Sequence, residues 1–86
     1  MIDSKTAVQK AKTYFSDLFP SASDVRLEEV ERSADGLSWL VTFSFAKPEI
    51  VVFGSPFANP HRDYKMVKLD SNTGEPQGVK IRAFAS

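Results

Sequence analysis

The sequence predicts an α+β fold in which one N-terminal helix packs on a four-stranded antiparallel meander sheet. Two patterns favour it. Apolar residues recur at three- and four-residue steps through residues 4–19, which is typical of an amphipathic helix. From Leu37 to Ala46 apolar residues take every second position, which is typical of a half-buried strand. Three further strand-like segments, separated by turn residues, complete the sheet.

The composition limits the classes of function. At 86 residues the chain is expected to form a single domain, residues 1–86. Its 11 basic and 11 acidic residues balance, so no net charge attracts it to nucleic acid or to an anionic membrane. It has no cysteine, which excludes disulfides and thiolate catalysis. No apolar run reaches the roughly 20 residues of a membrane span, and no secretion signal opens the sequence, so we expect a cytoplasmic protein.

The predicted helix covers residues 4–19. Asp3, Ser4 or Thr6 is suited to cap its N-terminus, and Pro20 ends it because proline lacks an N–H. Its apolar stripe consists of Ala7, Val8, Ala11, Phe15, Leu18 and Phe19. We expect this stripe to cover one face of the sheet. The alternative is a helix that binds a partner or a membrane surface.

The first predicted strand covers residues 25–34. Val25 and Leu27 face inward, and a bulge near Glu28–Glu29 is needed to return Val30 to the core. The strand and its start are acidic, through Asp24, Glu28, Glu29 and Glu31. Such charges either protect an edge strand from pairing with a neighbour or form a docking patch for a basic partner.

The turn Asp35–Gly36 leads into the central strand, because Asp-Gly readily adopts positive φ values. One face of that strand carries Leu37, Trp39, Val41, Phe43 and Phe45. The other face carries Ser38, Leu40, Thr42 and Ser44. We expect Trp39 to be buried beneath the helix, against Phe15 and Phe19.

A long apolar loop is predicted over residues 47–63, because Pro48 ends the central strand and two more prolines follow. The third strand then runs from Arg62 to Asp70, with Val67 and Leu69 on one side. Tyr64, Met66 and Lys68 lie on the other side. After the turn at residues 70–75, the last strand covers residues 79–84, with Val79, Ile81 and Ala83 inward and Lys80, Arg82 and Phe84 outward.

Several short motifs resemble PepSY-like domains. They are Trp39-Leu40-Val41 in a strand after a glycine turn, then Tyr64, and later Asp70-Ser71-Asn72-Thr73-Gly74-Glu75. PepSY-like domains are small cystatin-like α+β domains, generally non-catalytic and associated with peptidase propeptides. The resemblance therefore implies a helix on an antiparallel sheet and a regulatory link to a peptidase. The insertion 48–61 and Pro76 depart from the family's pattern, and the export signal is missing.

No constellation predicts catalysis or metal binding. His61 is the single histidine, and its neighbours Arg62 and Asp63 point to opposite faces if they continue a strand, while no nucleophile elbow is present. The turn at Asp70 is similar to half of a calcium loop, but it lacks the bidentate Glu at the twelfth position. We expect no enzyme, no cofactor and no metal.

A partner-binding face is the strongest functional candidate. Its predicted members are Leu40, Phe53, Phe57, Tyr64, Met66 and Phe84. Four of them project away from the helix, and Phe53 and Phe57 belong to the apolar loop. Apolar anchors ringed by Lys68, Lys80 and Arg82 are typical of an interface. The loop is either part of this interface or a lid over the sheet.

We therefore expect a non-catalytic protein-binding or regulatory module. Its partner is either a peptidase or another enzyme, which it inhibits or confers immunity against, or a second copy in a homodimer. The alternative is a small-molecule or single-stranded nucleic-acid binding domain, because Tyr64 and Phe84 lie among basic residues. Zero net charge makes nucleic acid the weaker option, and Lys65 and Lys68 point to opposite faces of the third strand. No membrane partner is expected.

Overall fold

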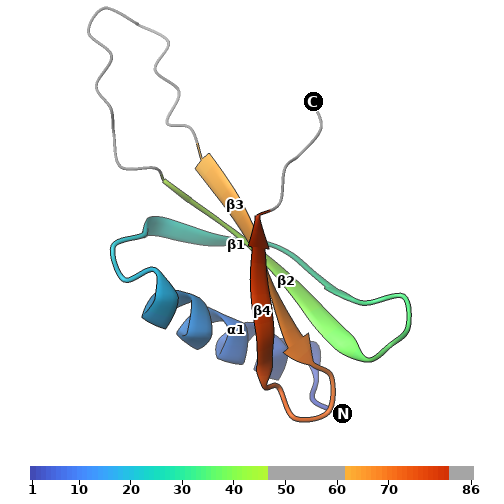
Figure 1. Cartoon of the computed structure of the whole chain (residues 1–86). Coiled ribbons are helices and arrows are strands. Elements are labelled where there is room, and N and C mark those ends of the chain that lie inside the picture. Colours follow the sequence, from blue (N-terminus) through green and yellow to red (C-terminus); the bar gives the residue numbers. More distant parts are fainter. Residues whose placement is uncertain (47–61, 82–86) are drawn as a thin grey trace, which may run out of the picture.

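The computed structural model describes residues 1–46 and 62–81. It contains one helix, α1 (Ser4–Leu18), and the strands β1 (Ser23–Arg32), β2 (Ser38–Ala46), β3 (Arg62–Asp70) and β4 (Pro76–Ile81). The strands pair antiparallel in the order β1-β2-β3-β4. Helix α1 lies across one face of this twisted sheet (Figure 1). The predicted α+β class and the meander are confirmed.

Helix α1 begins at a capping aspartate. The Asp3 Oδ1 atom accepts a hydrogen bond from the Thr6 N–H at 2.7 Å, which decides between the three predicted caps. The fully buried residues of α1 follow one another at four-residue steps: Ala7, Ala11 and Phe15. The helix ends at Leu18, and the Phe19 N–H donates to the Phe15 carbonyl. The prediction that Leu18 belongs to the buried stripe is wrong, because its side chain is exposed.

Strand β2 is the centre of the core, as predicted, and supplies more of its buried side chains than any other element described. The buried side chains on its helix-facing side are Trp39, Val41, Phe43 and Phe45. The Phe15 ring lies 5.3 Å from the Phe43 ring and 5.4 Å from the Phe45 ring, so aromatic contacts join α1 to the sheet. Leu37 was predicted to share this face but is 64% exposed. The reason is that β2 begins at Ser38, which leaves Leu37 in the preceding turn.

Trp39 is buried, as predicted, but its neighbours differ from those expected. Its indole Nε1 donates to the Ile2 carbonyl at 3.2 Å, and the Arg32 guanidinium lies 5.5 Å from the centre of the ring. The aromatic partners of Phe15 are instead Phe19, Phe43 and Phe45. Trp39 therefore packs near the start of α1, while the phenylalanines fill the space beneath its second half.

Strand β1 contains two bulges, of which the sequence indicated one. The register passes from Leu27 opposite Phe43 to Glu29 opposite Thr42, so Glu28 is the extra residue and Val30 comes to lie opposite Val41. This confirms the bulge that returns Val30 to the core. Leu27 was predicted to be buried, but it is 48% exposed because the helix contacts this edge strand less than the two central strands.

The second bulge lies near the start of β1. Two residues, Asp24 and Val25, stand opposite the single residue Phe45, and Asp24 takes a φ of +52°. Val25 still packs against the core, as predicted. Aspartate tolerates this left-handed conformation better than most residues other than glycine. Sequence reasoning did not detect this bulge.

The hairpin between β3 and β4 is closed by turn chemistry, as predicted. The Asp70 Oδ1 atom accepts hydrogen bonds from the N–H groups of Asn72 and Thr73, and Gly74 adopts a φ of +76°. Strand β4 starts at Pro76, three residues earlier than predicted, and residues 82–84 of the predicted last strand lie outside the described residues.

Candidate partner-binding face

The face of the sheet opposite α1, here named the outer face, holds three of the predicted site residues. In the register of β2 and β3, Leu40 stands opposite Lys68, Thr42 opposite Met66, and Ser44 opposite Tyr64. Residues directly opposite each other project to the same face of a sheet. Leu40, Tyr64 and Met66 are therefore brought together, and each is half-buried.

The centre of the outer face is polar and closely packed. Ser38, Thr42 and Ser44 are buried even though α1 lies on the other side of the sheet. Side chains from neighbouring strands contact two of them: the Ser38 hydroxyl donates to Gln77 Oε1 at 2.9 Å, and Ser44 is hydrogen-bonded to Glu28 and Arg62. Within the described residues every buried side-chain nitrogen or oxygen has a hydrogen-bond partner. The face thus combines partly exposed apolar side chains with a hydrogen-bonded polar centre.

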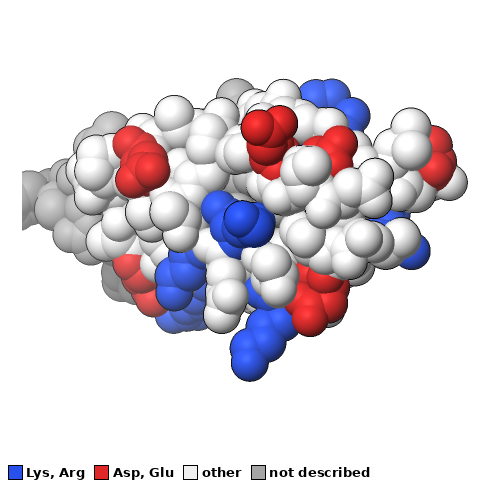
Figure 2. All heavy atoms as spheres, turned by 90° about the horizontal axis from the view of Figure 1, so that it is seen from below, with Lys and Arg blue, Asp and Glu red and all other residues white. Residues whose placement is uncertain are grey.

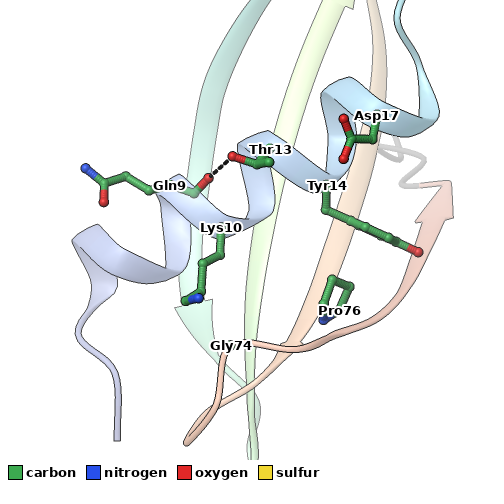
Figure 3. Close-up of a pocket in the computed structure, with 7 residues that line it drawn as sticks. All are labelled: Gln9, Lys10, Thr13, Tyr14, Asp17, Gly74 and Pro76. Atoms are coloured by element: carbon green, nitrogen blue, oxygen red, sulfur yellow. Dashed lines mark hydrogen bonds between the residues drawn. The ribbon is translucent and has the colours of Figure 1, made fainter.

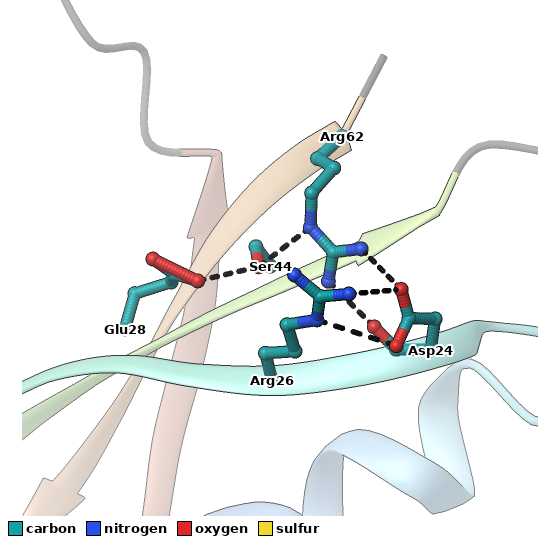
Figure 4. Close-up of polar contacts among 5 residues, drawn as sticks. All are labelled: Asp24, Arg26, Glu28, Ser44 and Arg62. Atoms are coloured by element: carbon teal, nitrogen blue, oxygen red, sulfur yellow. Dashed lines mark hydrogen bonds and ion pairs between the residues drawn. The ribbon is translucent and has the colours of Figure 1, made fainter. Parts of the chain in front are cut away.

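A polar cluster occupies the end of this face where β3 begins. We name it the Arg62 cluster; it consists of Asp24, Arg26, Glu28, Ser44 and Arg62 (Figure 4). The Arg62 guanidinium donates to Ser44 Oγ at 3.0 Å and to Asp24 Oδ2 at 2.7 Å, and also to the Asp24 carbonyl. The Ser44 hydroxyl in turn donates to Glu28 Oε1 at 2.9 Å. The cluster joins β1, β2 and β3.

The charges of the Arg62 cluster are paired. Hydrogen bonds from Arg62, and next from Arg26, hold the pKa of the Asp24 carboxyl below its usual range. The Arg62 side chain is only 16% exposed, so its hydrogen bonds are needed to offset the cost of removing the charged guanidinium from water. Sequence reasoning missed the cluster. Its signal was an arginine at the start of β3 and acidic residues near the start of β1, but local sequence does not show that these two strands lie on either side of β2.

The basic residues of the described strands do not form one surface. The Lys65 ammonium lies 4.9 Å from the centre of the Phe19 ring, on the helix side of the sheet. Lys68 stands opposite Leu40 on the outer face, so the predicted separation of these two lysines is confirmed. Glu29 and Glu31 also lie on the outer face, opposite Thr42 and Leu40. The view from below likewise shows acidic and basic side chains interspersed (Figure 2).

Three predicted site residues, Phe53, Phe57 and Phe84, lie outside the described residues. The same holds for His61 and for Arg82. The structure therefore brings together half of the predicted interface.

A shallow groove that sequence reasoning missed runs between α1 and the start of β4 (Figure 3). It measures about 420 Å³ and is lined by Gln9, Lys10, Thr13, Tyr14, Asp17, Gly74 and Pro76. Lys10, Tyr14 and Asp17 follow one another at spacings of four and three residues, which places them on one flank of the helix. That spacing was the available signal, but it does not show which strand faces the flank.

The described residues contain neither a metal site nor a membrane-spanning helix. Across residues 1–46 and 62–81, no three His, Cys, Asp or Glu side chains gather in a way that would hold a metal ion. No helix in this part of the chain is long and apolar enough to cross a membrane. No protein-family model matches the chain, and neither does a curated protein or a solved structure.

Proposed function

We propose that the chain is a non-catalytic protein-binding or regulatory module that acts in the cytoplasm. Its partner is a peptidase or another enzyme that it inhibits or confers immunity against, in keeping with the PepSY-like motifs, or a second copy of itself. The observation that carries this proposal is the outer face. Leu40, Tyr64 and Met66 lie near one another there and are partly exposed, while α1 covers the opposite face.

Truncation of this face tests the proposal. Tyr64→Ala and Met66→Ala should each weaken association by roughly 1–3 kcal/mol, because truncation of a large apolar anchor at an interface typically costs that much binding free energy. Two measurements apply: sedimentation equilibrium for a dimer, and titration calorimetry with the enzyme encoded by a flanking gene. The control is Lys12→Ala, a truncation of an exposed side chain on α1. If both face variants unfold the domain, the three residues belong to the core and the proposal fails.

The absence of catalysis is part of the same proposal. In the Arg62 cluster the Ser44 hydroxyl donates to Glu28 and accepts from Arg62, and Ser44 is fully buried, so a substrate cannot reach this hydroxyl as a nucleophile. His61→Ala should leave stability and binding nearly unchanged unless residues 47–63 are themselves the interface. A hydrolytic activity of the purified protein that disappears in His61→Ala would contradict a non-catalytic role.

A nucleic-acid surface receives less support. Lys65 lies over Phe19 on the helix side, and Glu29 and Glu31 share the outer face with Lys68. Phosphate binding depends on several adjacent cations, and affinity then falls steeply with salt. Binding of a single-stranded oligonucleotide with such a salt dependence would favour this alternative over a protein partner.

A further inference from the structure

Strand β4 is an edge of the sheet, and its described neighbour is β3 alone. Its residues Gly78–Ile81 pair one to one with Lys65–Lys68. In an edge strand, alternate residues direct their N–H and C=O groups away from the sheet, where they can pair with an added strand. A bulge at Gln77 precedes this regular stretch of β4, whereas the other edge, β1, is interrupted by two bulges within its length, which disturb the spacing of those groups.

The groove between α1 and β4 lies on the helix side of this edge. Lys10 stands at one end, near Gly74, and Tyr14 lies across from Pro76 in the middle (Figure 3). Asp17 follows about 10 Å beyond Lys10 along the helix. The groove thus presents a cation, an apolar centre and an anion in that order.

The groove and β4 run in the same direction. Ile2, which precedes α1, and Lys10, in the middle of α1, are close to Gly74, just before β4 begins. Just past the end of α1, the Lys65 ammonium lies over the Phe19 ring. Lys65 in turn stands opposite Ile81, the last residue of β4. Asp17 therefore lies toward the end of β4, and Lys10 toward its start.

We propose that an extended peptide segment of a partner protein adds to β4 as a fifth, antiparallel strand, with alternate side chains in the groove. An antiparallel peptide starts at the Asp17 end. The first peptide residue that points into the groove is then basic and pairs with Asp17. The second is apolar and packs against Tyr14 and Pro76, and the third is acidic and pairs with Lys10. The three positions alternate, since same-face residues in a strand are about 6.7 Å apart. First and third residues span about 13 Å, comparable to the distance from Asp17 to Lys10.

A display library of random linear 12-residue peptides, selected on the full 86-residue chain, tests this recognition. The expected enrichment is basic-x-apolar-x-acidic. The decisive variant is the charge exchange Lys10→Glu/Asp17→Lys, at two exposed positions where the fold should tolerate it. It should bind the enriched peptides at least about 10-fold more weakly and should itself select acidic-x-apolar-x-basic sequences. Circular dichroism confirms that the variant folds.

Nuclear magnetic resonance locates the bound peptide. The amide chemical-shift changes caused by the added peptide should centre on Gly78–Ile81. The same peptide-induced changes should be seen in Tyr64→Ala, whose substitution lies on the outer face. This independence separates the groove from the proposed outer-face interface. The proposal is overturned if no peptide is enriched, if the charge exchange leaves the selected sequences unchanged, or if the shifts lie away from β4. A homodimer with shifts centred on β4 also overturns it, because a second copy would then occupy the edge.

Discussion

The Trp39 indole donates a hydrogen bond to the carbonyl of Ile2, at 3.2 Å, and so joins the central strand to the residue that precedes the helix cap. The Ile2 N–H in turn donates to the Ser71 carbonyl at 3.0 Å. The chain before α1 is therefore held between the centre of the sheet and the β3–β4 turn. Trp39 contributes to stability both through burial and through this polar contact.

Trp39 should be the most sensitive position of the core. Trp39→Ala should cost about 3–5 kcal/mol of unfolding free energy, because it leaves a large cavity beneath the start of α1. Trp39→Phe should cost less, about 1–2 kcal/mol, since it keeps most of the apolar contact and loses the hydrogen bond. Urea unfolding measures both. A native fluorescence spectrum typical of a water-exposed indole would contradict the burial of this single tryptophan.

Gly74 should resist substitution more than Gly36. Both have φ near +75°, where an L side chain costs about 1–2 kcal/mol. A Cβ on Gly74 would also overlap Lys10 Cδ and lie 3.1 Å from Ile2 Cδ1, whereas a Cβ on Gly36 meets nothing within 4 Å. Gly36→Ala is thus a matched control. We expect Gly74→Ala to cost about 1 kcal/mol more than Gly36→Ala in urea unfolding.

The steric part of that difference can be isolated. In the double variant Lys10→Ala/Gly74→Ala the long side chain that meets the new methyl group is gone, so part of the loss should be recovered. Equal costs for Gly74→Ala with and without Lys10 would show that backbone strain alone acts at this turn.

Removal of Arg62 should destabilise the outer face. Arg62→Ala should cost about 1–3 kcal/mol, because a mostly buried guanidinium supplies hydrogen bonds to Ser44 and to Asp24. Arg62→Lys should not restore the loss, since an ammonium cannot reproduce the planar set of donors. Arg26→Ala is the control, because that side chain is 61% exposed and should matter little. Thermal unfolding at pH 7 compares the three variants.

The same cluster should make stability depend on acid. The folded pKa of Asp24 is lowered by Arg62 and Arg26, so the stabilising contact is present above the unfolded pKa and is lost as pH falls through the folded value. The wild type should therefore lose stability below about pH 4. Asp24→Asn should be less stable than the wild type at pH 7, and its unfolding free energy should fall less than that of the wild type on acidification. If the unfolding free energy of Asp24→Asn falls between pH 5 and 3 as steeply as that of the wild type, Asp24 does not have this role.

Local sequence determined the elements whose signals lie within a few residues. Helix α1 follows from apolar residues at the spacing of helical turns, with Asp3 three residues before the N–H that it caps. Strand β2 follows from alternation between Trp39 and Phe45. The turn at residues 70–75 follows from the preference of Asp70 for nearby N–H groups and of Gly74 for positive φ. Each of these preferences acts before the chain folds.

Tertiary structure decided what depends on the register between strands. The bulge at Asp24 and Val25, and the exposure of Leu27, follow from how an edge strand fits against β2. The contact between Arg62 and Asp24 joins residues 38 positions apart, and the groove forms where one flank of α1 meets β4. Pairing partners at such separations are chosen by the packing of the whole core. A local pattern specifies which face a side chain prefers, but the neighbours on that face are set only when the strands align.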